Sequence, residues 1–213
     1  MAYQKLEFVF ETCLKNIKIF AFDPFGCRVV QKLLEEFPVE KTRSILVALR
    51  SKTVQLCCCE FGNYIMQHVL HQGPDSERDL LIQKILKNFC FLSMDKCGSH
   101  VIERAFKEVK DEKFLNDIAR ILTTFDIEHK TYQLYDLIND KFGNYVIQRL
   151  FDYGSLGIKT SIINVLESPN ADLKKIYWTK YAGHVISYIV TKGYVIKNNN
   201  LFVEQLMRYG QNG

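Results

Sequence analysis

The sequence predicts an all-α protein built from repeats, and three observations support this fold class. A short stretch with two central apolar residues, of which residues 61–67 (FGNYIMQ) are one copy, occurs five times along the chain. The glycines of the first four copies, Gly26, Gly62, Gly98 and Gly143, are 36, 36 and 45 residues apart, a period typical of repeat architectures. Strand-like alternation is absent and only 4 prolines occur, so we expect the repeats to be helical.

Composition and charge place the chain among folded globular proteins. Its 213 residues are 47% hydrophobic and 24% charged, which is ample for a buried core. The formal net charge of +4 is too small to indicate a nucleic-acid partner by itself. No apolar run reaches the roughly 18 residues that a membrane span needs, and the first residues lack the apolar core of a signal peptide. We therefore expect a soluble protein that is not secreted and has no membrane partner.

The cysteines argue for a reducing, cytoplasmic location and against a metal site. Their number, 7, is odd, and those at positions 57, 58 and 59 are contiguous, which no ordinary disulfide framework uses. A zinc site built from these thiols with His68 and His71 would lack the CxxC spacing, and helical phase scatters the thiols. Cys27 has no histidine within its own motif, so it is not expected to be a nucleophile. We therefore expect that the protein is not an enzyme and that it binds no metal, cofactor or small-molecule substrate.

Each repeat is expected to open with an amphipathic helix, followed by a second helix that carries the motif. The amphipathic pattern predicts the first helices at Leu6–Phe20, Val39–Leu49, Leu80–Asn88, Phe114–Leu122 and Ile158–Leu166. Polar breaks at residues 72–76 and 153–155 close two of the repeats.

The start of the motif helix is marked most clearly in the first repeat. Asp23 can accept backbone hydrogen bonds as the N-cap, and Pro24 takes the first helical position, where no donor is needed. Asp95, Asp140 and Thr179 stand near the equivalent point in later repeats.

Both ends of the array and its longest repeat carry further expectations. The 45-residue repeat contains extra residues from Thr124 to Tyr135, which we expect to form a longer loop between helices. The repeats are predicted over residues 1–193, followed by a capping segment at 194–213 in which residues 201–209 form a short amphipathic helix. Because no polar cap precedes the first helix, we expect the chain to be cut from a longer array rather than covered by another molecule.

Helix geometry divides each motif into a packing side and a presented side. With an advance of about 100° per residue from the first variable residue, the fifth residue lies near 40° and the second near 100°. The apolar residues of the first repeat, Phe25, Val29, Val30 and Leu33, fall between about 160° and 300°. One side should therefore pack while the other presents three side chains, which we call the triplet. The triplets are Cys27, Arg28 and Gln31; Asn63, Tyr64 and Gln67; Ser99, His100 and Glu103; and Asn144, Tyr145 and Gln148.

The triplets have the chemistry that unstacked bases require. Their second residue is always a flat group, either aromatic or guanidinium, and their first and fifth residues can form hydrogen bonds. The carboxylate of Glu103, assisted by Ser99, suits the two donors of guanine. Two amides, as in Asn63 with Gln67, can match the acceptor, donor and acceptor of uracil. The Gln31 amide can satisfy adenine while Cys27 makes a short contact.

The sixth residue of each motif adds a second regularity. It is cationic in three repeats and titratable in one, and it stands beside the stacking position. These residues are Lys32, His68, Arg104 and Arg149. We expect them to line the path of the RNA phosphates, although charged side chains at this angle are also common on any exposed helix.

These motifs resemble those of the Pumilio, or PUF, family of RNA-binding repeat proteins, over about residues 6–193. The resemblance implies a right-handed α-solenoid of three-helix repeats forming an arc, whose concave face holds single-stranded RNA at one base per repeat. The family's code implies adenine for the first triplet, uracil for the second, guanine for the third and uracil for the fourth. Because chain and RNA run antiparallel in the family, the implied sequence is UGUA. The implied function is binding to mRNA 3′ untranslated regions, with repression or decay through effector proteins on the convex face.

The chain departs from the family pattern in three ways. A full family domain has eight repeats, whereas this chain matches the last four and a C-terminal pseudo-repeat. His100 stands where the family often has asparagine. The fifth motif offers Gly183, His184 and Ser187, so we do not expect it to read a base. The alternative function is a PUF-like scaffold that binds RNA shape or protein, for example in ribosome assembly, which degenerate triplets would favour.

Overall fold

A computed structural model of the chain describes residues 2–129, 131–168 and 179–194. The chain divides into two compact units, one ending at Val109 and the other beginning at Lys110. The predicted segment at 194–213, with its capping helix at 201–209, lies outside the described residues except for Tyr194.

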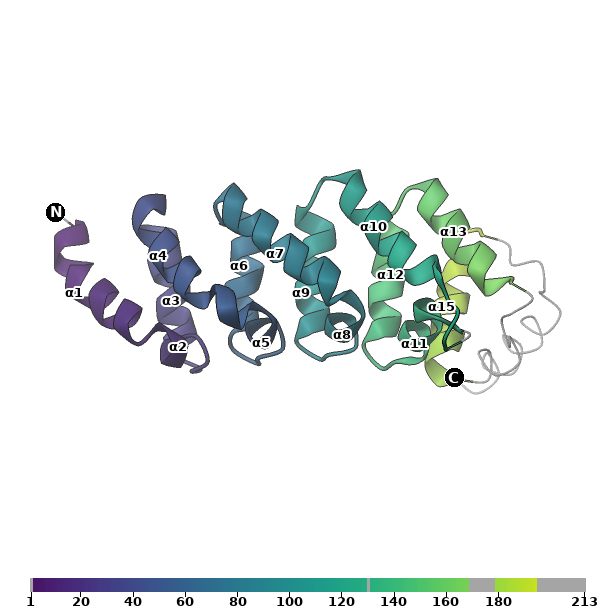
Figure 1. The fold of residues 1–213 in the computed structure, drawn as a ribbon, viewed down its shortest axis with the longest axis horizontal. Helices are drawn as coiled ribbons and strands as arrows, with labels where there is room; N and C mark the ends of the chain where they lie inside the picture. The colour runs from purple at the N-terminus through teal and green to yellow at the C-terminus, as the bar shows by residue number, and fades with distance from the viewer. Residues whose placement is uncertain (1, 130, 169–178, 195–213) are drawn as a thin grey trace. The chain divides into compact units, whose positions relative to one another are not determined.

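The first unit contains two repeats made of a short helix, a motif helix and an outer helix, and the short helix and motif helix of a third (Figure 1). They follow α1 (Ala2–Lys15). The short helices are α2 (Ile17–Phe20), α5 (Thr53–Cys57) and α8 (Phe89–Ser93). The motif helices are α3 (Gly26–Glu36), α6 (Asn63–Gln72) and α9 (Gly98–Glu108). The outer helices of the first two repeats are α4 (Val39–Leu49) and α7 (Asp75–Lys87), and the 3-10 turn η1 (Arg50–Lys52) follows α4.

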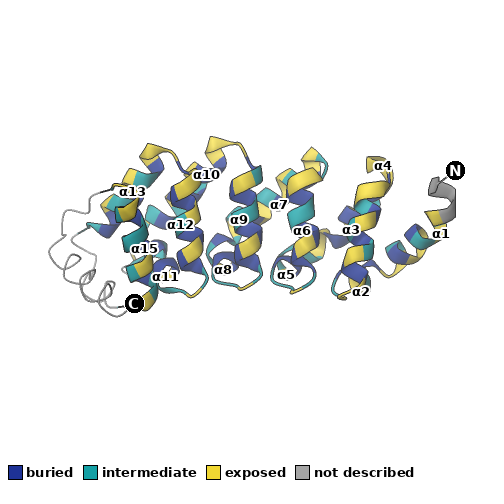
Figure 2. Ribbon diagram, turned by 180° about the vertical axis from the view of Figure 1, so that it is seen from behind, coloured by how far each residue is buried: buried dark blue, intermediate teal, exposed yellow. Residues whose placement is uncertain are grey.

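The motif helices of the first unit pack side by side, α3 on α6 and α6 on α9. Figure 2 views them from behind and shows that each carries both buried and exposed residues. Their central apolar pairs supply the core, and Val30, Ile65 and Ile102 are fully buried, each with an exposed fraction of 0%. The predicted packing side is therefore confirmed in the middle of the motif.

The predicted packing is wrong for Phe25, whose side chain is 81% exposed. The motif helix α3 begins only at Gly26, so Phe25 lies in the preceding turn, where helical phase does not determine its direction. Val29 is half-buried. Pro24 likewise lies before the helix rather than at its first position.

The predicted aspartate hydrogen bonds at the start of the motif helix are confirmed in three repeats, although the N-cap residues are Phe25, Cys97 and Phe142, each two residues after the aspartate. The Asp23 carboxylate accepts hydrogen bonds from the backbone N–H of Phe25 at 2.9 Å and of Gly26 at 2.7 Å. Asp95 and Asp140 make the equivalent bonds at 2.7–2.9 Å. These carboxylates satisfy N–H groups that a helix start leaves without an intrahelical partner. Thr179 differs, because its hydroxyl donates to the side chain of Asn139 instead.

The motif glycine permits a close approach between the motif helix and the short helix before it. A Cβ atom added at Gly26 would lie 2.5 Å from the backbone oxygen of Phe20, and one added at Gly98 would lie 2.5 Å from that of Leu92. Real Cβ atoms do not approach backbone oxygen so closely. This contact explains why the glycine recurs with the repeat.

The sequence prediction of one helix over Leu6–Phe20 is wrong, because the helix is interrupted at Asn16, between α1 and α2. The Asn16 side chain donates to the backbone oxygen of Thr12 at 3.0 Å, a local bond that competes with continued helix. The other predicted first helices coincide with outer helices, although α7 begins five residues before the predicted Leu80.

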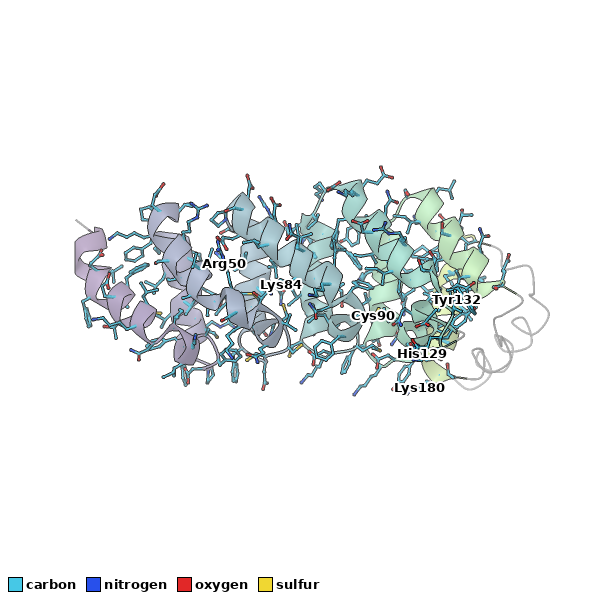
Figure 3. All side chains as sticks on the ribbon, viewed as in Figure 1. Arg50, Lys84, Cys90, His129, Tyr132 and Lys180 are labelled. Carbon is cyan, nitrogen blue, oxygen red and sulfur yellow. The ribbon has the colours of Figure 1, made fainter. Side chains whose placement is uncertain are left out.

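An ion pair between the exposed Arg50 and the buried Glu77 joins the outer layer of the first two repeats. Arg50, labelled in Figure 3, donates from Nη2 to Glu77 Oε1 at 2.5 Å and from Nε to Oε2 at 3.1 Å. Glu77 lies on α7 and is only 5% exposed. The bidentate geometry provides the buried carboxylate with two charge-assisted hydrogen bonds.

The second unit continues the helical pattern and contains one hairpin. Its elements are α10 (Glu112–Thr123), β1 (Phe125–Asp126), β2 (Thr131–Tyr132), α11 (Gln133–Asn139), α12 (Gly143–Tyr153), α13 (Leu156–Leu166) and α15 (Lys180–Thr191). The motif helix α12 packs against both α11 and α15.

The expected loop at residues 124–135 is instead a short antiparallel hairpin that leads into α11. Phe125 pairs with Tyr132, and Asp126 pairs with Thr131. At the hairpin end Asp126 accepts from the backbone N–H of His129 at 3.0 Å and pairs with its Nδ1 at 2.9 Å. Figure 3 labels His129 and Tyr132. Strands of two residues are too short to produce a detectable alternation in the sequence.

Within the described ranges, no helix is long and apolar enough to cross a membrane.

Candidate nucleic-acid interface

The four triplets share one pattern of exposure. Their second residue is exposed and their fifth is half-buried in every repeat. Their first residue is buried: Cys27 is 1% exposed, Asn63 3%, Ser99 4% and Asn144 1%. The expectation that all three side chains are presented is therefore wrong for the first residue.

The first residue is buried because its side chain bonds back to the turn that precedes the helix. The Cys27 thiol donates to the backbone oxygen of Pro24 at 3.4 Å, and the Ser99 hydroxyl donates to that of Lys96 at 3.1 Å. Each bond reaches three residues back. The first residue therefore stabilises the helix start as well as standing beside the presented surface.

The two asparagines at the first position are bound more completely. Asn63 Nδ2 donates to the backbone oxygens of Cys59 at 2.8 Å and Glu60 at 2.9 Å. Its Oδ1 accepts from Gln67 Nε2 at 2.8 Å. Asn144 in the second unit repeats the arrangement, donating to residues 140 and 141 at 2.9 and 2.8 Å and accepting from Gln148 at 3.2 Å.

The fifth residue of the first repeat is held differently. Gln31 Nε2 donates to the backbone oxygen of Tyr64, in the next repeat, at 3.1 Å. Its Oε1 accepts from Arg28 Nη1 at 3.1 Å. The three glutamines thus share a position in the motif but differ in which partners hold their amides.

Flat side chains stand at the exposed second position. The Tyr64 and Tyr145 residues are 41% and 59% exposed, and the His100 side chain is 63% exposed. In the first unit the Arg28 guanidinium lies over the Tyr64 ring, 4.6 Å from its centroid. His100 Nδ1 is 4.0 Å from Glu103 Oε1 in its own triplet. The predicted reading of these residues as surface groups rather than core aromatics is confirmed by their exposure.

The structure brings the first three triplets together on neighbouring helices of the first unit, α3, α6 and α9. The fourth triplet stands on α12 of the second unit. The fifth motif, on α15, has an exposed His184 and a half-buried Ser187, and that it reads no base stays a prediction.

The cationic residues at the sixth position are paired with carboxylates of their own helices. Lys32 Nζ lies 2.8 Å from Glu35 and 3.5 Å from Glu36. Arg104 lies 3.2 Å from Glu108, and Arg149 lies 3.1 Å from Asp152. The spacing of three or four residues was available in the sequence, but the acidic partners were missed. A phosphate would have to compete with them, so the phosphate role stays a prediction.

His68, the fourth residue of this set, is largely buried, with an 11% exposed side chain. Burial lowers its pKa, against the opposing effect of Glu35, which lies 3.9 Å from its Nδ1. A neutral imidazole can offer a phosphate a hydrogen bond but not a charge. His68 is therefore a weaker phosphate candidate than the other three.

Each cysteine is a free thiol. Burial raises the pKa of Cys13 to about 11 and that of Cys57 to about 12, which keeps both thiols protonated and unreactive. Burial also raises the pKa of Cys58 to about 11, with Asp95 acting in the same direction. In the described part of the chain, no group of three or more His, Cys, Asp or Glu side chains is placed to hold a metal ion.

Comparison with known proteins identifies these repeats. The family model described as "Pumilio-family RNA binding repeat" matches residues 16–49, 52–86, 88–114 and 133–167. Pumilio homolog 12 from Arabidopsis thaliana is 25% identical over 186 residues, covering 87% of this chain and 30% of the relative. Fem-3 mRNA-binding factor 1 from Caenorhabditis elegans is 26% identical, covering 63% of this chain and 25% of the relative. The chain thus spans less than a third of the length of these relatives.

Solved structures agree on the fold. PUF-8 in complex with PBE-RNA matches with a TM-score of 0.80 at 21% identity, over 90% of this chain and 55% of that one. The RNA-binding domain of yeast Puf5p bound to MFA2 RNA matches with a TM-score of 0.65 at 26% identity, over 81% and 46%. The predicted fold class, an all-α solenoid of three-helix repeats, is confirmed.

The short helix, motif helix and outer helix recur with the period of the sequence, and four matches to the repeat model together cover more than half of the residues. The chain belongs to the Pumilio family of RNA-binding repeat proteins.

Proposed function

We propose that the chain is a sequence-specific single-stranded RNA-binding protein that recognises UGUA, one base per repeat. The observation that carries the proposal is the exposure pattern of the four triplets. Each has a buried first residue, an exposed flat second residue and a half-buried fifth residue. A flat group beside a hydrogen-bonding group is what an unstacked base requires, since it presents a ring face and a polar edge.

The third triplet gives the sharpest base assignment. Glu103 is half-buried and its carboxylate is acceptor-only, which suits the adjacent N1–H and N2 donors of guanine. An amide at this position would instead offer guanine one donor and one acceptor, leaving one pair mismatched. A mismatch of this kind costs the full desolvation of the unpaired group.

The other three assignments follow the resemblance. The amides of the second and fourth triplets are assigned uracil, and Cys27 with Gln31 is assigned adenine. With RNA antiparallel to the chain, the order is UGUA from the fourth triplet to the first. The fourth triplet stands in the second unit, and its uracil is likewise proposed from the resemblance.

The cellular role is proposed from relatives. The names of matched proteins refer to mRNA binding and to 3′ UTR recognition sequences. We propose that this chain binds mRNA 3′ untranslated regions in the cytoplasm, recruits protein effectors and thereby represses translation or promotes decay.

Four bases set an upper limit on affinity. Stacking contributes about 1–3 kcal/mol per base, or roughly 4–12 kcal/mol before the costs of association. The expected dissociation constant of the isolated chain for a four-base RNA is about micromolar, weakening with salt. Nanomolar binding would contradict this account.

A base-swap titration tests the proposal. The double variant Ser99→Asn with Glu103→Gln gives the third triplet the side chains at the first and fifth positions of the second triplet. Its preference between UGUA and UUUA, measured by fluorescence anisotropy with labelled RNA, should shift from G to U. If the wild-type ratio persists, the base assignment fails.

The chain offers a matched control on the outer helix α4. Glu40→Gln with Ser44→Asn makes the same two replacements four residues apart, away from the triplets. This variant should keep the wild-type preference. A chain that does not rank four-base RNAs at all would instead support the scaffold function.

A further inference from the structure

A groove lies in the first unit between the outer helices α4 and α7, on residues that the triplets do not use. Its volume is about 290 Å³, and its lining also includes residues of η1 and of the motif helix α6. We call it the outer groove. Part of its lining is apolar and at most 6% exposed, namely Leu46, Leu49, Met66, Val69 and Leu81. The outer groove therefore offers apolar walls to a side chain that enters it.

The exposed part of the same lining is cationic. It includes Arg50, whose side chain is 45% exposed, and the exposed Lys84, and Figure 3 labels both residues. Leu80, which is 38% exposed, adds an apolar edge beside them. Among the residues that the structure describes, none forms an ion pair with Lys84. The mouth of the outer groove thus combines positive charge with exposed apolar surface.

The Arg50 guanidinium is held in place and still has donors to offer. Glu77, the one acidic residue of the lining, accepts from its Nε and Nη2. Within the described part of the chain Arg50 Nη1 makes no hydrogen bond. Because a guanidinium carries five N–H donors, Arg50 can bind a second carboxylate at the mouth while it keeps Glu77 paired.

The sequence around the outer groove strengthens this positive charge. No aspartate or glutamate occurs in residues 41–59 or in residues 80–94. Two further lysines stand in these stretches, Lys52 in η1 and Lys87 one turn after Lys84 on α7. Charge complementarity therefore favours an occupant that is acidic as well as apolar.

The lining distinguishes between kinds of acidic occupant. Among the described residues that line the outer groove, none is aromatic, whereas unstacked bases bind on flat side chains. A free small ligand usually occupies about 300–1,000 Å³ and is largely enclosed, but this groove is smaller and its mouth is open. One large apolar side chain fits its walls, and the chain on either side would cross the mouth, where the Ser51 hydroxyl is exposed.

We propose that the outer groove binds an acidic segment of a partner protein. One leucine or phenylalanine of the segment inserts against Leu49 and Leu81, and neighbouring carboxylates bind Arg50 and Lys84. The inference goes beyond the proposed function and does not depend on it, because no triplet residue takes part. RNA and the segment are expected to bind the same chain at the same time.

Designed peptides test both halves of this recognition. The full chain would be titrated, by fluorescence anisotropy, with labelled peptides in which a central phenylalanine or leucine is flanked by glutamates. Replacing the central residue with alanine should weaken binding by about tenfold, the range of one buried apolar side chain. Replacing the glutamates with lysines should weaken it by at least as much. Equal affinity after either replacement would overturn the inference, as would failure of both acidic peptides to bind.

Substitutions at the mouth locate the binding. Lys84→Glu and Leu80→Gln change exposed side chains, so the fold should persist, and each should weaken the acidic peptide by about fivefold or more. The matched controls, Lys18→Glu and Ile19→Gln, make the same changes at exposed residues of α2 and should leave the affinity unchanged. Equal losses in the controls would show a general attraction and overturn the inference. Arg50 is left intact, because its removal would leave the buried Glu77 without a partner.

Competition separates the acidic segment from other occupants. UGUA should not displace the acidic peptide, and displacement would show that the peptide binds the triplets instead. Loss of RNA binding rather than peptide binding in Lys84→Glu would assign the groove to nucleic acid. A dimer of the chain that Leu80→Gln dissociates, measured by sedimentation, would assign it to a second copy. Each of these results would overturn the inference, whereas a chain that binds the acidic peptide but ranks no RNA would overturn only the proposed function.

Discussion

The Arg28 guanidinium and the Tyr64 ring are in contact across two repeats, with 4.6 Å between the guanidinium carbon and the ring centroid. A base held between two flat groups needs two stacking distances of about 3.4 Å each, or about 7 Å in total. A base can therefore enter between these side chains only if they separate. A cation–π contact at an exposed site stabilises by about 0.5–1 kcal/mol, less than the about 1–3 kcal/mol of stacking on a base.

The first prediction concerns the flatness of Arg28. Arg28→Lys keeps the charge but removes the planar group that can stack. We expect affinity for UGUA to fall about fivefold, because stacking on the guanidinium is lost. The loss is partly offset, since the wild-type chain must separate Arg28 from Tyr64 before a base can enter and the variant need not. Titrations at several salt concentrations should show an unchanged salt dependence. Unchanged affinity would indicate that Arg28 acts through its charge alone.

The second prediction concerns the motif glycine. Gly98→Ala would place a Cβ atom 2.5 Å from the backbone oxygen of Leu92, so the motif helix and α8 must move apart. We expect the free energy of unfolding to fall by about 1–3 kcal/mol, measured by urea denaturation. Gly183→Ala is the control, because a Cβ atom there meets nothing within 4 Å. It should be neutral or stabilising by up to about 1 kcal/mol, the usual helix preference of alanine.

The third prediction concerns the phosphate path. If Lys32 contacts a phosphate, Lys32→Gln should reduce the slope of log affinity against log salt by about 0.7, the value for one charge on single-stranded nucleic acid. Lys41→Gln on the outer helix α4, where Lys41 pairs with Glu7 at 2.6 Å, should leave the slope unchanged. Equal slopes for wild type and Lys32→Gln would show that Lys32 pairs only with Glu35 and Glu36 and contacts no phosphate.

The fourth prediction concerns pH. Burial holds the pKa of His68 below its ordinary value, near 6.5 in an unfolded chain. The unfolded state therefore binds the proton first as pH falls, so the contribution of His68 to stability is complete above about pH 6.5 and is lost below it. His68→Gln should flatten the dependence of Tm on pH between about 7 and 5. His100→Gln, at an exposed side chain, is the control and should retain the wild-type slope.

The periodic features of this fold were accessible from the sequence, and the local ones were not. The spacing of the motif glycines located the motif helices, because each apolar pair, such as Val101 and Ile102, must face a core. The same projection placed Tyr64 and Tyr145 on the surface. The short helices, of four to seven residues, contain too few turns to show an amphipathic period, so α5 and α8 were missed.

The burial of the first triplet residue was inaccessible for a different reason. A helical wheel treats the helix as isolated, whereas Asn63 stands at its first residue, where backbone oxygens of the preceding turn lie within reach. The contact between Gln31 and the Tyr64 backbone depends on how two repeats stack. Neither the contact of Asn63 nor that of Gln31 produces a periodic pattern in the sequence.

Because the first triplet residue is buried, its identity is constrained by folding before it is constrained by RNA. Cysteine, serine and asparagine all fit the site, and each bonds to the preceding turn. A side chain chosen only for its complementarity to a base could leave those backbone oxygens without a hydrogen-bond donor. It could also be too large for the buried site. An engineer who randomises the first and fifth residues together should therefore recover far fewer specificities than there are combinations, with most losses appearing as insoluble protein rather than as altered binding.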